Sequence, residues 1–153
     1  MNYVNKILQA NESISARGKL HWIIYIPGIT YMLIDLILCL IYSGAEQYEK
    51  SMVGAAVGIF TIIAIFSLFR AWLARWTTEI AVTNRRIIYK RGFISRKTIE
   101  MNMDKVESVD VDQTILARML NFGTITIRGT GAGIEPLKKI STPLDLRNAI
   151  TSR

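Results

Sequence analysis

The sequence has few of the residues that enzymes most often use for catalysis and metal binding. Its 153 residues include one cysteine, Cys39, and one histidine, His21. A single thiol excludes an intramolecular disulfide and a cysteine-based zinc site, and a single imidazole excludes a multi-histidine metal site. The two residues lie far apart in sequence, so no pairing for nucleophilic catalysis is indicated. We therefore expect a protein without enzymatic activity, cofactor or metal.

Charged residues are scarce in two long stretches. Trp22–Tyr42 contains Asp35 as its only charged residue, and Met52–Phe69 contains none. A helix needs about 20 predominantly apolar residues to cross a bilayer, and the second stretch reaches that length when it is extended to Leu73. The sequence therefore predicts a transmembrane hairpin of two helices, at residues 22–42 and 52–73. Two buried helices of a soluble protein are the alternative, but so short a chain has little else with which to cover them.

Basic residues outnumber acidic ones, 19 to 12, and the excess lies on one side of the predicted hairpin. Residues 1–76 hold 6 basic and 4 acidic side chains, and residues 77–153 hold 13 and 8, so the net charge of +7 divides as +2 and +5. The connector Ser43–Ser51 has one lysine against two glutamates. Because cytoplasmic flanks carry the excess of Lys and Arg, we expect both termini in the cytoplasm and the connector outside.

From residue 77 onward the hydrophobic pattern changes to a period of two, which indicates half-buried strands. The strands predicted after the hairpin are Thr78–Thr83, Arg86–Lys90, Phe93–Glu100, Lys105–Val111, Thr124–Arg128 and Ile134–Ile140. Glu12–Lys19 alternates in the same way, so we expect residues 1–21 to supply the first strand of the domain at residues 77–153. A short helix capped by Asp112 and a C-terminal helix beginning at Pro143 complete the pattern.

Seven short antiparallel strands followed by a helix are the layout of a pleckstrin-homology-like (PH-like) barrel. The runs Thr83–Gly92 (TNRRIIYKRG), Asp104–Gly129 and Thr142–Ile150 (TPLDLRNAI) resemble the bacterial PH-like family found in small membrane proteins. Leu8–Trp22, which leads into the hairpin, is also similar to that family, so the resemblance covers nearly the whole chain. It implies a membrane α+β fold in the bacterial cytoplasmic (inner) membrane: a two-helix transmembrane hairpin plus a seven-stranded antiparallel barrel with a C-terminal helix. It implies little about activity, because such barrels serve many binding purposes.

Six basic residues in the first hairpin after the second apolar stretch are the best candidates for a binding site. They are Arg85, Arg86, Lys90, Arg91, Arg96 and Lys97. The chain holds them near the inner leaflet, where each Lys or Arg close to an anionic surface contributes about 1 kcal/mol. Anionic headgroups or an acidic protein partner would suit them. Positive-inside topology and solubility explain the same residues without any binding.

Polar and small residues inside the apolar stretches form the second group of candidates. An ionisable residue near the middle of a bilayer normally faces protein or water. An antiparallel hairpin brings Asp35 to the depth of Thr61, which predicts a hydrogen bond between them, with a contact between protomers or an ion path as alternatives. Gly54 and Gly58 are spaced for close helix packing. Packing against the first helix and self-association explain these glycines equally well.

The expected function is a membrane-anchored interaction module that binds a protein partner, or a second copy of itself, near the inner leaflet with help from anionic lipid. The alternative is a subunit of a small oligomeric transport or channel assembly that uses Asp35. We expect no nucleic acid partner.

Overall fold

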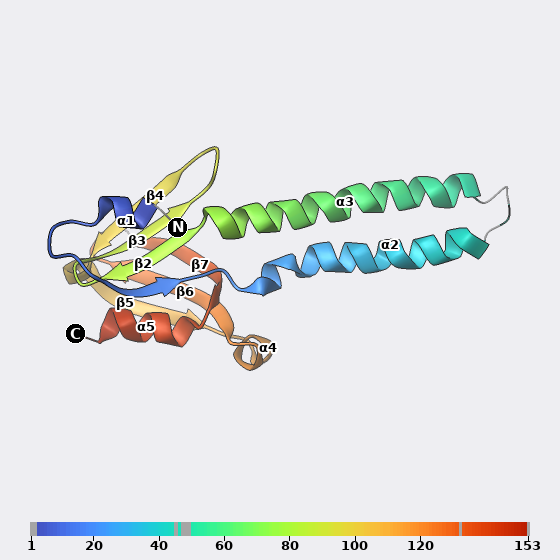
Figure 1. Ribbon diagram of the computed structural model, residues 1–153. Helices are drawn as coiled ribbons and strands as arrows, with labels where there is room; N and C mark the ends of the chain where they lie inside the picture. Colours follow the sequence, from blue (N-terminus) through green and yellow to red (C-terminus); the bar gives the residue numbers. More distant parts are fainter. Residues whose placement is uncertain (1–2, 45, 47–49, 132, 153) are drawn as a thin grey trace. The chain divides into compact units, whose positions relative to one another are not determined.

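The structure is a computed structural model that describes residues 3–44, 46, 50–131 and 133–152 (Figure 1). The chain divides into two compact units. Trp22–Leu73 forms one, the helical unit, and Met1–His21 together with Ala74–Arg153 forms the other, the sheet domain. The sheet domain is therefore discontinuous in sequence. The turn predicted within Ser43–Ser51 falls on residues 45 and 47–49, which lie outside the described residues.

The described residues of the helical unit form a short 3-10 turn and two long apolar helices. Its elements are η1 (Trp22–Tyr25), α2 (Ile26–Gly44) and α3 (Lys50–Thr77), the last of which continues into the sheet domain. By length and composition, both long helices could cross a membrane. Their large apolar side chains are mostly exposed, with Leu33 56% and Phe66 65% accessible. Exposed apolar surface on this scale is typical of segments that contact lipid or another protein.

The described residues of the sheet domain form seven strands in two antiparallel sheets. The first sheet has the order β1 (Ile14–Gly18), β2 (Glu79–Thr83), β3 (Arg86–Arg91) and β4 (Lys97–Asn102). The second has the order β5 (Val106–Asp112), β6 (Phe122–Gly129) and β7 (Ile134–Ser141). The remaining elements are α1 (Tyr3–Ile7), η2 (Met103–Lys105), α4 (Ile115–Met119) and α5 (Pro143–Thr151). The α+β class and the C-terminal helix are confirmed, but the strands form two sheets rather than a single closed barrel.

Strand β1, which precedes the apolar helices, pairs with β2, which follows them. Ala16 lies opposite Val82 and Gly18 opposite Ile80. Beyond β1 the chain reaches the second sheet through an isolated bridge between Leu20 and Ile140. The predicted strand at 12–19 is thus present in the sheet. Because β1 belongs to the sheet, the segments on both sides of the helical unit are held together.

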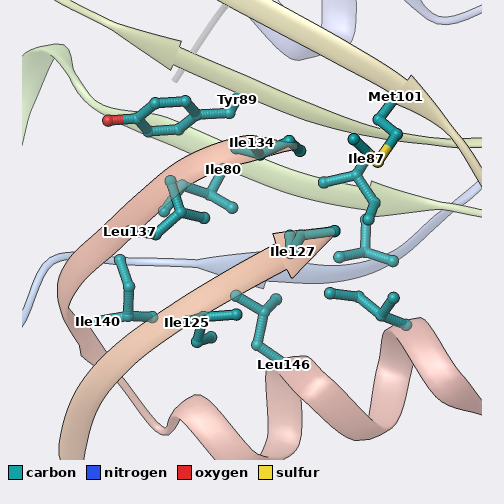
Figure 2. Packing of buried hydrophobic residues seen from close by; sticks show 12 residues of the cluster. Ile80, Ile87, Tyr89, Met101, Ile125, Ile127, Ile134, Leu137, Ile140 and Leu146 are labelled. Carbon is teal, nitrogen blue, oxygen red and sulfur yellow. The ribbon is translucent and has the colours of Figure 1, made fainter. Parts of the chain in front are cut away.

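The main core lies between the two sheets and α5. The first sheet contributes Ile80, Val82, Ile87, Tyr89 and Met101, the second contributes Ile125, Ile127, Ile134, Leu137 and Ile140, and α5 contributes Leu146 and Ile150 (Figure 2). A smaller cluster of Val4, Ala81 and Ile88 lies on the opposite face of the first sheet, under α1. Both faces of β2 are therefore covered, and all five of its residues are buried.

Two predicted boundaries were wrong for local reasons. The strand predicted at Phe93–Glu100 begins at Lys97, because Arg91 pairs with Lys97 and the intervening residues form the hairpin turn. Gly92 begins that turn at φ +98°, a conformation that favours glycine. The short helix is capped by Thr114, whose side chain accepts a hydrogen bond from the amide of Ala117, and not by Asp112.

Candidate functional site

The six basic candidates do not form one cluster, because β3 separates them. Arg85 and Arg86 lie at the start of β3, and Lys90 and Arg91 at its end. Five residue steps along a strand span about 16 Å, roughly twice the Debye length at physiological salt. Glu79, the first residue of β2 and the second after the end of α3, pairs with Lys90. The C-terminal end of β3 therefore lies beside the end of α3, and the N-terminal end of β3 lies away from α3.

Arg86 is engaged inside the sheet domain. Its Nη2 lies 2.9 Å from Glu12 Oε2 and its Nη1 lies 2.7 Å from Glu100 Oε2. Nη2 also donates to the carbonyl of Ile7 at 2.8 Å. The Arg86 side chain is only 13% exposed and that of Glu12 is fully buried. Arg86 therefore holds the segment before β1 against β3. The hydrogen bonds and charges of the two carboxylates, chiefly Glu12, raise the pKa of Arg86.

Glu12 is the buried acceptor at the centre of this arrangement. Besides Arg86, it accepts hydrogen bonds from the amide of Gln9 at 2.9 Å and the hydroxyl of Thr83 at 2.8 Å. Burial by itself would raise the pKa of Glu12. The hydrogen bonds from Arg86, Gln9 and Thr83 outweigh burial and lower that pKa from 4.5 to about 2. Glu12 is consequently ionised at every physiological pH.

The other end of β3 lines a pocket of about 450 Å³. Its lining comes from α1, the last turn of α3, β2, β3 and the turn before β4, and comprises Tyr3, Lys6, Trp76, Thr77, Glu79, Lys90, Gly92, Phe93 and Arg96. All of these residues belong to the sheet domain. Three cations face one carboxylate, and three aromatic rings supply apolar wall. This chemistry suits an acidic group attached to an apolar body.

The carboxylate of the pocket is already engaged. Glu79 accepts hydrogen bonds from the amides of Tyr3 at 3.5 Å and Val4 at 3.3 Å, and it lies 3.7 Å from Lys90 Nζ. Burial opposes ionisation, but these two amides and the charge of Lys90 together lower the pKa of Glu79. Lys90 also lies 4.6 Å from the centre of the Tyr3 ring, within cation–π range. Glu79 and Lys90 thus fix α1 over the first sheet.

The exposed cations of the pocket, Lys6 and Arg96, have no ion-pair partner in the described part of the chain. Nearby Lys97 forms an ion pair with Glu135 on the second sheet, and this interaction lowers the pKa of Glu135. Of the six predicted basic residues, Lys90 and Arg96 therefore reach the pocket and Arg91 and Lys97 flank it along the chain. Arg85 is exposed at the far end of β3.

The sequence did not indicate Tyr3, Lys6, Trp76 or Phe93 as members of this site. Tyr3 and Lys6 belong to a five-residue helix that lies before the apolar stretch and is far in sequence from β3. Trp76 and Phe93 approach each other with ring centres 6.3 Å apart. The sequence placed Phe93 at the start of a strand, whereas the structure places it in the turn before β4, so no local signal assigned it to the pocket.

The predicted contact between Asp35 and Thr61 is present in the helical unit. Thr61 Oγ1 lies 2.9 Å from Asp35 Oδ2 and 2.9 Å from the carbonyl of Val57, so the hydroxyl is shared between two acceptors. The second oxygen, Asp35 Oδ1, is buried and has no hydrogen-bond partner among the described residues. Buried polar atoms normally have such a partner.

Of the glycines Gly28, Gly54 and Gly58, Gly28 is the one most tightly packed against the other long helix. A Cβ built on Gly28 would lie 2.5 Å from Leu68 Cδ2, whereas one on Gly54 would lie 3.3 Å from Tyr42 Cε2. A Cβ on Gly58 would meet nothing within 4 Å. Packing inside the helical unit therefore accounts for Gly28 and does not account for Gly58. Self-association through Gly58 remains a prediction.

Comparison with known proteins identifies one family. The sequence profile described as "Bacterial PH domain" matches residues 24–153 and so includes both apolar helices as well as β2 to α5. The match confirms the resemblance inferred from the sequence. No curated protein and no solved structure matches the chain.

Proposed function

Because the chain belongs to the bacterial PH domain family, we propose that it is a membrane-anchored interaction module whose pocket binds an acidic segment of a protein partner. The pocket at the end of β3 is the observation that supports the proposal. Its lining includes three cations, Lys6, Lys90 and Arg96, but only one carboxylate, Glu79, which already forms an ion pair with Lys90. The proposed location is the cytoplasmic membrane of a bacterium, with both termini in the cytoplasm.

Anchoring is supported by the surfaces of the two long helices. Both are long and apolar enough to cross a bilayer, and little of either is buried within the unit. A hydrocarbon solvent would remove the cost of exposing side chains such as Leu33 and Phe66 to water. Within the bilayer, the buried Asp35–Thr61 hydrogen bond would reduce the cost of one ionisable group.

The sidedness is supported by β1. Since β1 pairs with β2, the segments before and after the helical unit must lie on the same side of any membrane that the unit spans. Both segments are basic, with Lys6, Arg17 and Lys19 before α2 and Arg70 and Arg75 at the end of α3. The positive-inside rule therefore supports a cytoplasmic location for the whole sheet domain.

Labelling of single cysteines tests this topology. In a Cys39→Ser background, a cysteine at Glu46 should react with a membrane-impermeant maleimide added to intact cells. A cysteine at Asp145 on α5 should react only after the cells are opened. Reaction of Asp145→Cys in intact cells, or of Glu46→Cys only in opened cells, would contradict the proposed orientation.

An acidic segment is the proposed occupant because the uncompensated charge in the pocket is positive. Lys6 and Arg96 are exposed, and Lys90 is held between Glu79 and the Tyr3 ring. Carboxylates bound by Lys and Arg make charge-assisted hydrogen bonds that are roughly twice as strong as neutral ones. The aromatic wall would favour an apolar or aromatic side chain next to the acidic one.

Photo-crosslinking in native membranes tests the pocket. A photoreactive residue at Ser95, in the turn beside the pocket, should yield an adduct with a partner protein. The same residue at Asn102, which pairs with Arg86 at the far end of β4, is the matched control. A polyglutamate peptide added to inside-out vesicles should compete for the Ser95 adduct, and Lys6→Glu should abolish it. The proposed site would be refuted by an adduct that survives both treatments or that forms equally well from Asn102. An adduct of two copies of this chain would show self-association instead.

Asp35 supports a second candidate function, a subunit of an oligomeric transport or channel assembly. The supporting observation is the buried, unpartnered Oδ1, since an ionisable group of this kind within a membrane often marks an ion path. Asp35→Asn keeps the shape of the side chain and removes its charge, and Asp35→Leu removes its polarity as well. In proteoliposomes that hold a pH gradient, normal assembly with loss of proton flux in both variants would favour transport over the interaction module. No flux from the wild-type protein would remove this candidate.

A further inference from the structure

We propose that two apolar tips of the sheet domain insert into the interfacial layer of the lipid bilayer. This inference rests on the membrane anchoring proposed above and adds a second mode of membrane contact. The first tip, the α4 tip, consists of Ile115, Leu116, Met119 and Leu120, and the second, the turn tip, consists of Phe93 and Ile94.

The α4 tip exposes apolar surface that its own fold does not cover. Ile115 is 81% exposed, Leu116 68% and Met119 77%, while Ala117 is the only buried residue of the helix. Thr114 caps the helix through the amide of Ala117, so the exposed face belongs to a formed turn of helix. A single turn that presents large apolar side chains to water is unfavourable unless another apolar phase covers it.

The turn tip has the same character. Ile94 is 95% exposed and Phe93 is 56% exposed, at the end of the hairpin between β3 and β4. Gly92 begins the turn at a positive φ, a conformation that favours glycine. The sheet alternation that buries Ile87 and Tyr89 ends before this turn, so neither apolar residue has a core position.

Each tip lies beside a point where the chain leaves the sheet domain for the apolar helices. His21, the last residue before that exit, stacks on Phe122 with ring centres 5.2 Å apart. It also forms a hydrogen bond with the backbone of Leu120, the final residue of the α4 tip. At the other junction, Trp76 in the last turn of α3 lies 6.3 Å from the Phe93 ring. Two apolar tips from distant parts of the sequence thus adjoin the two attachments.

Lipid is the occupant that this arrangement favours. If the helices span the bilayer, the residues at their ends lie at the membrane surface, and side chains in contact with those residues lie within reach of the interface. Both tips also carry cations, with Arg118 on α4 and Arg91 and Arg96 around the turn. Exposed apolar side chains flanked by Lys or Arg are typical of segments that bind the interface of an anionic leaflet.

Fluorescence of the full-length protein in anionic liposomes tests the proposal. An environment-sensitive dye is attached to one cysteine at a time in the Cys39→Ser background, at Leu116 for the α4 tip or at Ile94 for the turn tip. The controls are Glu107, which lies five residues from the α4 end of β5, and Arg85, at the far end of β3. Dyes at Leu116 and Ile94 should show blue-shifted emission and should be quenched by lipids that carry a spin label near the headgroup. Dyes at the two control positions should show neither effect.

Three results would overturn the proposal. An unshifted spectrum at both tips shows that the tips stay in water. A blue shift without quenching by spin-labelled lipid shows that protein, for example a second copy, covers them. Equal quenching at the control positions shows no preference for the tips. Anchoring is verified independently with a dye at Leu40 on α2, which should be quenched by a spin label deep in the acyl chain. Absence of quenching at Leu40 would refute the proposed membrane anchor rather than the tips alone.

Discussion

Replacing Glu12 with glutamine removes one charge from the interior of the sheet domain while it preserves the shape of the side chain. Glu12 accepts hydrogen bonds at 2.8–3.0 Å from Arg86, Thr83 and Gln9. A glutamine amide nitrogen cannot accept any of them, and Arg86 would lose one of its two carboxylates. Breaking a buried ion pair by removing one partner costs about 3–5 kcal/mol. Because Arg86 would still form its ion pair with Glu100 and its hydrogen bond to the Ile7 carbonyl, we expect a cost at the lower end of this range, about 3 kcal/mol.

Thermal unfolding of the full-length protein in detergent, followed by near-UV circular dichroism, measures this cost. For a domain of about 100 residues, 3 kcal/mol corresponds to a decrease in Tm of roughly 12 °C or more. Glu100→Gln is the matched control, since it removes the 37% exposed partner of the same arginine and should cost about 1 kcal/mol or less. Adding Arg86→Gln to Glu12→Gln should recover part of the stability, because it removes the uncompensated charge. A wild-type Tm for Glu12→Gln, or equal losses for the two glutamate variants, would refute the reasoning.

The remaining predictions concern pH and substitutions at three glycines. Because the pKa of Glu12 is about 2 in the folded protein and 4.5 in the reference state, its contribution is present above pH 4.5 and is lost as the pH falls toward 2. Unfolding measured from pH 6 to pH 2.5 should show a loss of roughly 2–3 kcal/mol that Glu12→Gln lacks, after allowance for solvent screening. Gly28→Val should lower the Tm of the helical unit in detergent, since its side chain would collide with Leu68, whereas Gly58→Val meets open space and should not. Gly92 lies at φ +98°, so Gly92→Ala should destabilise the hairpin turn by about 1 kcal/mol or more. Amide hydrogen exchange in β4 should increase, and unchanged exchange would contradict this prediction.

The family and the main elements could be predicted because they depend on signals local in sequence. Two apolar stretches of sufficient length specify the long helices, and alternation such as that of Ile125 and Ile127 specifies strands. The same locality explains the errors. The pattern from Phe93 to Glu100 reads as one strand, yet the pairing of Arg91 with Lys97 converts its first part into a turn.

The candidate site depended on contacts that no local pattern contains. The six basic residues are neighbours in sequence, but β3 places Arg85 and Arg86 at one end and Lys90 and Arg91 at the other. Arg86, which the sequence suggested as a binding residue, is held by Glu12, a partner 74 residues away. Charge alone does not reveal which cations a fold will use internally.

The sequence by itself determined that this protein has two helices of membrane-spanning length and a basic PH-like domain, because hydrophobic length, periodicity and net charge are properties of neighbouring residues. Only the tertiary structure decided which residues meet. It brought Tyr3 and Lys6 across the first sheet to form the pocket with Lys90 and Arg96. It also left the apolar face of α4 outside the core and beside His21. These outcomes follow from strand register and from packing between distant segments, since burial and contact depend on the partner as much as on the residue itself.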